Sequence, residues 1–255
     1  MFFTKSQVVA FLLSTSSVTA KAVLETRQED LRWGPDCGLQ ATKSEIIGTT
    51  STIYPGKMPQ GQKGYMFNWI GLQDMSSSGQ QVGDLVQSII GSYPAGWSEC
   101  DGPNADTTWC ISSEVYGNDA SGRLIQMVGD KRTAAVNYEN GIVIDYKLVD
   151  KATYLWEQTM TDAVTGEVLS TYKKTSGRMR LWNTAVELQD ANGNDPTGTI
   201  EPQYYVNTTI TLAEADSTYG NGFYSERGAT CKGITTSDGG KTWFVEKMTI
   251  PAMVV

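Results

Sequence analysis

Alternating apolar and polar residues predict short β-strands along most of the chain. The clearest runs are rich in β-branched and aromatic residues: Met66–Gln73, Cys110–Tyr116, Ile142–Val149, Met179–Gln189, Tyr204–Leu212 and Lys241–Ile250. Turn residues separate these runs at short intervals, and no convincing helical pattern stands out. We therefore expect one all-β domain, an antiparallel β-sandwich of the jelly-roll or concanavalin-like type, with a β-barrel as the alternative.

The segment Asp84–Tyr93 fits either a strand or a short helix. Gly91 and Pro94 end it early, and the pair Ile89-Ile90 favours extended backbone because β-branched residues pack well on a pleated surface. We therefore assign it as a strand.

The pair Asn140-Gly141 suits the type I′ turn of a two-residue hairpin. It predicts a hairpin that joins Thr133–Tyr138 to Ile142–Val149. These two runs would then be neighbours in one sheet.

The stretch Lys151–Lys174 predicts a second hairpin. Two β-rich runs, Thr153–Thr161 and Glu167–Lys174, flank a turn that contains glycine. Trp156 and Gln158 share one face of the first run, so this face mixes a large apolar group with a polar one. The mixture makes the hairpin a candidate pocket wall, although an amphipathic sandwich strand explains it about as well.

The N-terminus has the pattern of a secretory signal peptide: Lys5, the apolar run Val8–Leu13, and the small-residue cleavage pattern Ala20-x-Ala22. We expect removal of residues 1–22, which leaves 23–255 as a single domain in the secretory pathway or outside the cell.

Cleavage removes two of the twenty basic residues and none of the twenty-eight acidic ones, so the formal net charge moves from −8 to −10. This charge argues against nucleic-acid and anionic-membrane partners. No later stretch is apolar enough to span a bilayer, and the oligomeric state stays open.

Four cysteines remain after cleavage, an even number that predicts two disulfides in an oxidising compartment. Of the three connectivities we favour Cys100–Cys110, which closes a short loop, and Cys37–Cys231, which ties the N-terminal segment to a late strand. No pair has zinc-site spacing, so we expect no metal. The sequon at Asn207 can carry a glycan if it is exposed.

Histidine is absent from the chain. Its absence removes Ser-His-Asp and Cys-His catalysis, histidine-ligated zinc and the usual proton shuttle near neutral pH. The chain instead has seven tryptophans and twelve tyrosines against six phenylalanines. Aromatic rings with a polar edge line ligand cavities because they combine area, stiffness and a hydrogen-bond donor, although a sandwich core uses them as well.

Carboxylates offer acid chemistry, and several lie on or beside predicted strands: Glu114, Asp145, Glu157, Glu187, Glu201 and Glu214. A glycosidase needs two of them across a sugar, but the E-x-D-x-x-E run of laminarinases is absent. A glutamic peptidase needs one Gln and one Glu that act on a water, for which Gln126 and Glu157 are candidates. Asp101, Asn104 and Asp106 resemble calcium ligands but lack EF-hand spacing, so we expect a surface turn there.

The segment Gly83–Gly117, GDLVQSIIGSYPAGWSECDGPNADTTWCISSEVYG, resembles a group of small secreted fungal proteins from terpenoid–polyketide biosynthetic clusters. The likeness continues through Tyr154–Ser170, YLWEQTMTDAVTGEVLS, and covers most of the mature chain. The chain is similar to the hetero-Diels–Alderases that join a tropolone o-quinone methide to a humulene-type sesquiterpene. The resemblance implies a pericyclase that uses no cofactor.

Such a cycloaddition needs two apolar reactants held in a reactive pose, which can contribute roughly 7–11 kcal/mol. It also gains from hydrogen-bond donors aimed at the quinone-methide oxygen as negative charge builds there. We expect catalytic donors and apolar substrate-binding walls on neighbouring strands: Gln158, Tyr146 and Tyr172 as donors, and Trp69, Trp156 and Trp182 as walls. Formation of the quinone methide by loss of water would add a general-acid role for a tyrosine or a carboxylic acid.

Two other classes of function stay open, a carbohydrate-binding lectin-like protein and an acid-active hydrolase. An enclosed, mostly apolar pocket with isolated donors favours the pericyclase. A shallow aromatic groove favours the lectin. Two carboxyl groups, or a Gln and a Glu, that converge across an open cleft favour the hydrolase.

Overall fold

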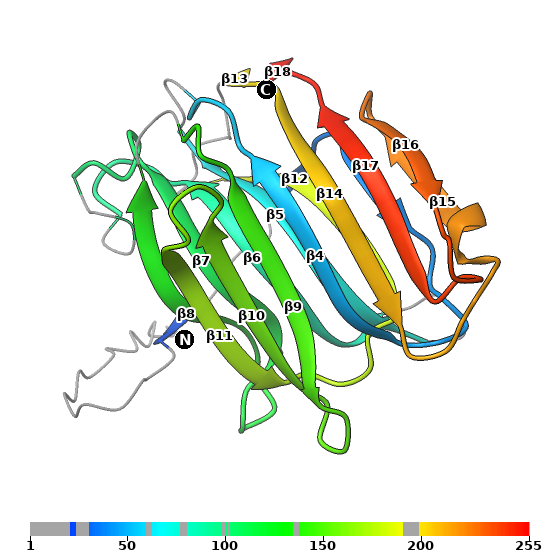
Figure 1. The fold of residues 1–255 in the computed structure, drawn as a ribbon. Coiled ribbons are helices and arrows are strands. Elements are labelled where there is room, and N and C mark those ends of the chain that lie inside the picture. The colour runs from blue at the N-terminus through cyan, green and yellow to red at the C-terminus, as the bar shows by residue number, and fades with distance from the viewer. Residues whose placement is uncertain are drawn as a thin grey trace, which may run out of the picture.

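The computed structural model describes residues 21–23, 31–59, 63–76, 81–97, 100, 103–134, 138–190 and 199–254. Within these residues, nine strands form one antiparallel sheet, called sheet A (Figure 1). Its path is β1 (Lys21–Val23), β8 (Leu124–Ala134), β7 (Trp109–Asn118), β6 (Gln81–Ser92), β5 (Tyr65–Met75), β12 (Leu181–Gln189), β3 (Asp36–Leu39) and β15 (Phe223–Glu226), with β2 (Arg32–Trp33) paired to β12.

A second antiparallel sheet, sheet B, has seven strands in the described part of the chain and lies in front of sheet A in Figure 1. Its path is β11 (Val168–Thr175), β10 (Leu155–Asp162), β9 (Ile142–Asp150), β4 (Ile46–Tyr54), β14 (Gln203–Leu212), β17 (Thr242–Ile250) and β16 (Thr230–Thr235). The short strands β13 (Thr199–Ile200) and β18 (Met253–Val254) pair separately, and one 3-10 turn, η1 (Tyr219–Gly222), precedes β15.

The core lies between the two sheets, which confirms the predicted all-β sandwich. Alternate residues on each strand enter it, as in β10, where Trp156, Gln158 and Met160 are buried and the residues between them are partly exposed. Trp182 and Tyr205 fill the same layer from β12 and β14. Each large apolar side chain buried in this way contributes about 1.5–3 kcal/mol relative to an exposed one.

Two of the local predictions are confirmed and one is wrong. Gln81–Ser92 is a strand, and β10 pairs with β11 as the predicted hairpin. The Asn140-Gly141 hairpin does not form, because β8 belongs to sheet A whereas β9 belongs to sheet B and pairs with β10 and β4. Gly141 adopts a positive φ of 77°, but Asn140 is not among the described residues with positive φ, so the pair does not form the predicted type I′ turn.

Both predicted disulfides are present. Cys100–Cys110 closes the loop before β7. Cys37–Cys231 joins β3 of sheet A to β16 of sheet B, and the two Cα atoms are 5.9 Å apart. The second bond therefore fastens the two layers of the sandwich to each other.

Most of the predicted signal peptide, residues 1–20, lies outside the described residues. Lys21 and Ala22 form part of β1, which pairs with β8, so cleavage after Ala22 would shorten this edge strand. No helix in the described residues is long and apolar enough to cross a membrane.

Candidate functional site

The side of sheet A that faces away from sheet B is not uniformly polar. On β5 the residues Met66, Ile70 and Leu72 enter the main core, so Phe67 and Trp69 face the opposite side. We call this opposite side the outer face.

An apolar cluster separate from the main core covers the middle of the outer face. We call it the apolar floor; its members are Phe67, Trp69, Leu85, Ile89 and Ala185. Trp69 is only 3% exposed, whereas Trp33 of β2, which meets it edge-on with ring centroids 6.3 Å apart, is 43% exposed. Such an aromatic edge can contact an apolar molecule on the floor.

One row of residues crosses the floor from strand to strand. In register order it contains Glu114 of β7, Gln87 of β6, Gly71 of β5, Asn183 of β12 and Gly38 of β3. We call it the central row. A Cβ atom on Gly71 would lie 3.0 Å from Leu85 Cδ1 and 3.3 Å from Trp69 Cζ3, so these side chains close over the glycine. The central row thus presents an apolar platform with an amide on either side.

Gln87 is buried, at 4% exposure, yet its hydrogen bonding is incomplete. Its Nε2 donates to Gln126 Oε1 at 3.3 Å, and its Oε1 has no hydrogen-bond partner among the described residues. An unpaired buried amide oxygen is costly unless a water or a ligand donates to it.

Glu114 ends the central row in a cluster of polar side chains. Its Oε2 accepts from Gln126 Nε2 at 2.6 Å, and its Oε1 accepts from Ser112 Oγ. The glutamate is 2% exposed. Both carboxylate oxygens therefore already have donors, and solvent scarcely reaches them.

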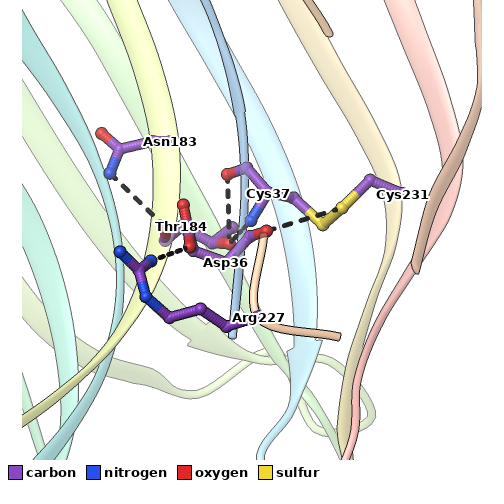
Figure 2. The surroundings of a disulfide bond; sticks show 6 residues. All are labelled: Asp36, Cys37, Asn183, Thr184, Arg227 and Cys231. Atoms are coloured by element: carbon purple, nitrogen blue, oxygen red, sulfur yellow. Dashed lines mark hydrogen bonds and ion pairs between the residues drawn. A yellow bond between two sulfur atoms is a disulfide. The ribbon is translucent and has the colours of Figure 1, made fainter. Parts of the chain in front are cut away.

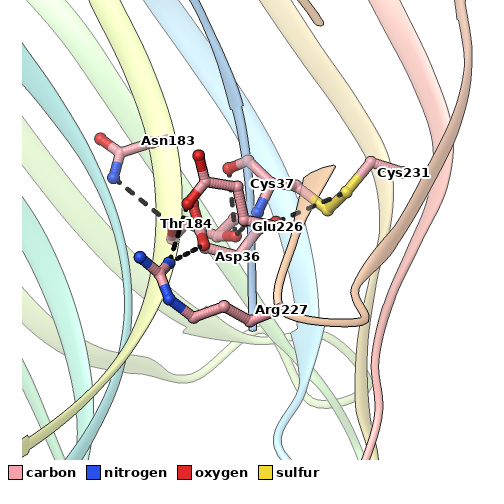
Figure 3. A network of polar contacts seen from close by, with 7 residues as sticks. All are labelled: Asp36, Cys37, Asn183, Thr184, Glu226, Arg227 and Cys231. Carbon is pink, nitrogen blue, oxygen red and sulfur yellow. Dashed lines mark hydrogen bonds and ion pairs between the residues drawn. A yellow bond between two sulfur atoms is a disulfide. The ribbon is translucent and has the colours of Figure 1, made fainter. Parts of the chain in front are cut away.

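A second polar group lies at the other end of the floor, on the outward side of β3 and β15 (Figure 3). Arg227 Nη1 contacts Asp36 Oδ1 at 2.7 Å and Glu226 Oε2 at 3.0 Å. Burial raises the pKa of Asp36 above its ordinary value, although the Arg227 charge opposes this shift. Burial and the nearby carboxylates raise the pKa of Tyr224 to about 12, and its ring covers Gly38.

The sheet-to-sheet disulfide fixes this polar group (Figure 2). Cys37 directly follows Asp36, and its main-chain N–H donates to Thr184 Oγ1 at 3.1 Å. The Cys231 sulfur lies 3.8 Å from the main-chain oxygen of Asp36. Arg227 has a left-handed backbone, with φ of 50°, and follows β15 directly.

Amide and acid contacts also connect β5 to β12 across the floor. Gln73 Nε2 donates to Asn183 Oδ1 at 3.3 Å, and Trp69 Nε1 donates to Glu187 Oε2 at 2.9 Å. Glu187 pairs in register with Trp33. These contacts fix the orientation of the platform and of its amide border.

The structure does not bring the six predicted site residues into one pocket. Trp69 lies on the outer face. Tyr146 and Gln158 are each 1% exposed, and both point into the interior from neighbouring positions on β9 and β10. Tyr172 is next in the same row, on β11, and is partly exposed.

The two remaining predicted walls are interior residues. Trp156 Nε1 donates to the main-chain oxygen of Gly177 at 2.9 Å. Trp182 is fully buried, and its Nε1 has no hydrogen-bond partner within the described chain. Their burial makes both tryptophans parts of the sandwich core.

The proposed Gln126–Glu157 dyad is not supported. Gln126 belongs to the Glu114 cluster on the outer face of sheet A. Glu157 lies between the inward residues Trp156 and Gln158, so it projects from the opposite side of sheet B, where it pairs with Lys173 at 2.8 Å. Two layers of strands separate the pair.

Three further predictions concern the glycosylation sequon, the residues that resemble calcium ligands, and metal binding. Asn207 is exposed on β14 with φ of 53°, which leaves its glycosylation as a prediction. Asn104 caps a turn by accepting from Thr107 and Thr108, while Asp101 lies outside the described residues. No group of three or more metal-ligating side chains occurs among the described residues.

Two shallow hollows lie away from the outer face of sheet A. One, of about 380 Å³, is bordered by charged side chains that include Lys43, Glu45 and Arg178. The other, of about 220 Å³, contains Tyr54 and Tyr204, which stack with ring centroids 4.7 Å apart. Lys247 lies 4.6 Å from the Tyr204 centroid and Gly141 lies against Tyr54, so little ring face remains for a sugar.

Four residues of the outer face were not predicted as site residues: Gln87, Asn183, Asp36 and Arg227. Gln87 and Asn183 each interrupt an otherwise apolar or alternating strand, which was the available signal. Asp36 and Arg227 are far apart in the chain, and only the pairing of β3 with β15 brings them together.

A scan against protein-family models and a search of curated proteins both found no match. Among solved structures the chain is similar to scytalido-glutamic peptidase bound to a peptide-based transition state analog, with 11% identity, a TM-score of 0.45, and coverage of 85% of this chain and 99% of that one. A second structure of that peptidase, with a transition state analog inhibitor, has 12% identity and a TM-score of 0.45, and the match covers 84% of this chain and 97% of that one. SCP-B, a member of the eqolisin peptidase family bound to Ala-Ile-His, has 11% identity and a TM-score of 0.41, and the match covers 85% of this chain and 99% of that one. Likenesses of this size do not identify an activity.

Proposed function

We propose that the protein is a cofactor-free pericyclase that joins a tropolone o-quinone methide to a humulene-type sesquiterpene by a hetero-Diels–Alder reaction on the outer face of sheet A. The main support is the central row, in which the apolar platform over Gly71 lies between the amides of Gln87 and Asn183. The sequence resemblance at Gly83–Gly117 supports the same reaction class, and this segment spans most of β6 and of β7, which carry Gln87 and Glu114 of the central row.

The apolar floor provides the surface that this reaction needs. Two apolar reactants lose contact with water when they lie against the partly exposed members of the floor, Phe67 and Leu85, and their relative orientation becomes fixed. Trp33 then forms a side wall beside the hydrocarbon. The reaction forms its new bonds between the substrates alone, so no side chain has to act as a nucleophile.

The amides provide the polar part of the proposed mechanism. Among the described residues Asn183 Nδ2 makes only a long contact of 3.4 Å, to the Thr184 main-chain oxygen, so this N–H₂ group is available to donate to a quinone-methide oxygen. Gln87 Oε1 has no partner among the described residues, and it can accept from a tropolone hydroxyl when the buried side chain turns toward the floor surface. A fixed donor at an oxygen that gains negative charge lowers the barrier more than it stabilises the ground state.

Asp36 supports an additional role in forming the quinone methide. Asp36 lies on the outward side of β3 next to the floor, and burial raises the pKa of its carboxyl group while the Arg227 charge lowers it. Protonation of a hydroxymethyl group by Asp36 lets the carbon–oxygen bond break and water leave. The tropolone hydroxyl then returns a proton to the carboxylate, so the net change is loss of one water.

A glutamic hydrolase is the second candidate, because Gln126 and Glu114 do form a Gln–Glu pair. Two observations weigh against it. Glu114 is nearly inaccessible and already accepts two hydrogen bonds, which is unfavourable for a base that must activate water. The residue across Gly71 from Gln87 is Asn183, an amide that cannot serve as a base.

The test uses purified protein, a tropolone quinone-methide precursor and humulene, with product stereochemistry measured by chiral chromatography. The proposal predicts a product ratio that differs from the uncatalysed mixture. A ratio equal to that mixture contradicts it. Peptide hydrolysis that is abolished by Glu114→Gln would instead establish the second candidate.

A further inference from the structure

The underside of the central row is held by polar side chains from sheet B. Tyr146 Oη donates to the main-chain oxygen of Ile70 at 2.7 Å, directly before Gly71. Tyr205 Oη reaches the Trp69 main-chain oxygen at 3.4 Å. Interior hydrogen bonds therefore connect the sheet B layer to the strand that carries the platform.

Gln158 makes the corresponding contact beneath β6 and β7. Its Nε2 donates to the main-chain oxygen of Glu114 at 2.8 Å, and its Oε1 accepts from Ser88 Oγ at 3.4 Å. Glu114 is itself in the central row, and Ser88 is the neighbour of Gln87. One buried amide thus holds both strands at the polar end of the row.

These contacts coincide with an irregularity in the pairing of β7 with β8. The register shifts between Ser112 and Glu114, where two residues of β8, Gly129 and Asp130, oppose Ser113 alone, so the β-bulge lies in β8. Ser170 Oγ from β11 accepts the Ser113 N–H at 2.8 Å and donates to the main-chain oxygen of Asp130. Sheet B therefore bonds main-chain groups of both strands at the bulge, and bulges direct the side chains beside them.

We propose that Gln158 is a positioning residue for the outer-face site, with Ser170 in a supporting role. From the interior they hold β7 and the facing bulge of β8 in the shape that aims Ser112 and Glu114 at Gln126, and Gln126 at Gln87. This inference rests on the proposed function. It gives Gln158 a task in catalysis without contact with substrate.

The rival explanation is that Gln158 merely fills the core. Met160 provides a matched control because it lies two residues along the same strand, faces the same interior and is fully buried, but has no amide. Gln158→Met keeps the side-chain length and removes the hydrogen bonds. Met160→Leu changes core shape and leaves the bonds of Gln158 in place.

The first measurement is hydrogen–deuterium exchange of the full-length protein in peptides that cover residues 85–90 and 110–117. We expect faster exchange of both segments in Gln158→Met, faster exchange of the Ser113 amide in Ser170→Ala, and wild-type exchange there in Met160→Leu. This readout does not depend on turnover. Equal exchange in Gln158→Met and Met160→Leu would overturn the proposal, even if the cycloaddition is confirmed.

The second measurement is the rate of cycloaddition. Misplaced donors should lower kcat about 10-fold to 100-fold in Gln158→Met, while KM changes about twofold or less. Met160→Leu should retain kcat within about twofold of the wild-type value, since volume-conserving core changes are tolerated best. An equal loss of kcat in both variants would contradict a positioning role. Absence of stereoselective product from the wild type would contradict the proposed function. The exchange result would then remain as the test of whether Gln158 holds β6 and β7 in place.

Discussion

Gln87 and Asn183 lie in one row on either side of Gly71, each one strand away from it on the outer face of sheet A. Trp69 and Leu85 close over the glycine between them. An apolar platform with an amide at each border is suited to hold an apolar reactant that has one polar oxygen. Several measurable consequences arise from this arrangement.

Replacement of Asn183 by aspartate should slow the cycloaddition more than replacement by leucine. Leucine removes a donor, whereas aspartate also places negative charge next to an oxygen that becomes negative in the transition state. We expect kcat to fall by about 10²–10³-fold in the aspartate variant, as it does when an enzyme loses one hydrogen-bond donor of an oxyanion hole. Steady-state kinetics at fixed pH measure both. Equal rates for wild type and Asn183→Asp would exclude this amide from the reaction.

Replacement of Trp33 by alanine should weaken binding of the hydrocarbon reactant. An edge-on aromatic contact contributes about 0.5–1.5 kcal/mol, which corresponds to about a 2-fold to 12-fold increase in KM for the sesquiterpene. The KM for the tropolone precursor should change less, because its recognition depends on the amides. Equal increases for both reactants would show that Trp33 does not distinguish them.

Loss of the Cys37–Cys231 bond should destabilise the fold more than loss of Cys100–Cys110. The first bond joins residues 194 positions apart and the second joins residues 10 apart. In the chain-entropy model the longer loop gives about 5 kcal/mol and the shorter about 2–3 kcal/mol. Urea unfolding of the two double serine variants measures the difference. The reverse order of stability would show that local strain outweighs loop entropy.

Asp216 should make the fold sensitive to acid. Burial raises its pKa, but hydrogen bonds from Thr218, Lys43 and Thr42 outweigh burial and lower the pKa to about 2. The lowered pKa means that its contribution to stability is present above its ordinary value of 3.8 and is lost as pH falls from there toward about 2.

Asp216→Asn should therefore destabilise the protein at pH 6 and have a smaller effect at pH 2. Chemical unfolding at the two pH values provides the comparison. An equal destabilisation at both pH values would mean that the charge of Asp216 is not the source of the stabilisation.

Strand positions were predictable because alternation is a local property. The predicted strand Met179–Gln189 contains β12, in which Trp182, Thr184 and Val186 occupy alternate buried positions. The Asn140-Gly141 pair failed for the opposite reason. A turn signal is local, but the partners of β9 are not: β10 and β4 pair with its two edges and leave none for β8.

The site was harder to predict because sequence alternation does not say which side of a strand faces the other sheet. Gln158 was expected to line a pocket, yet it faces the interior, where it bonds the backbone of Glu114. Trp69 was also chosen and lies on the outer face, where its Nε1 contacts Glu187. Asp36 and Arg227 become neighbours only after β3 and β15 pair, so no local pattern contains them.

The most direct test of the account compares the stereochemistry of the cycloadduct formed by the wild type, by the double variant Gln87→Met/Asn183→Leu, and by Phe244→Leu. Phe244 is a control because it is an exposed residue on β17 of sheet B. We expect one dominant stereoisomer with the wild type and with Phe244→Leu. With the double variant we expect a ratio of stereoisomers close to that of the uncatalysed mixture. An unchanged dominant stereoisomer from the double variant would contradict the location of the reaction on the outer face of sheet A.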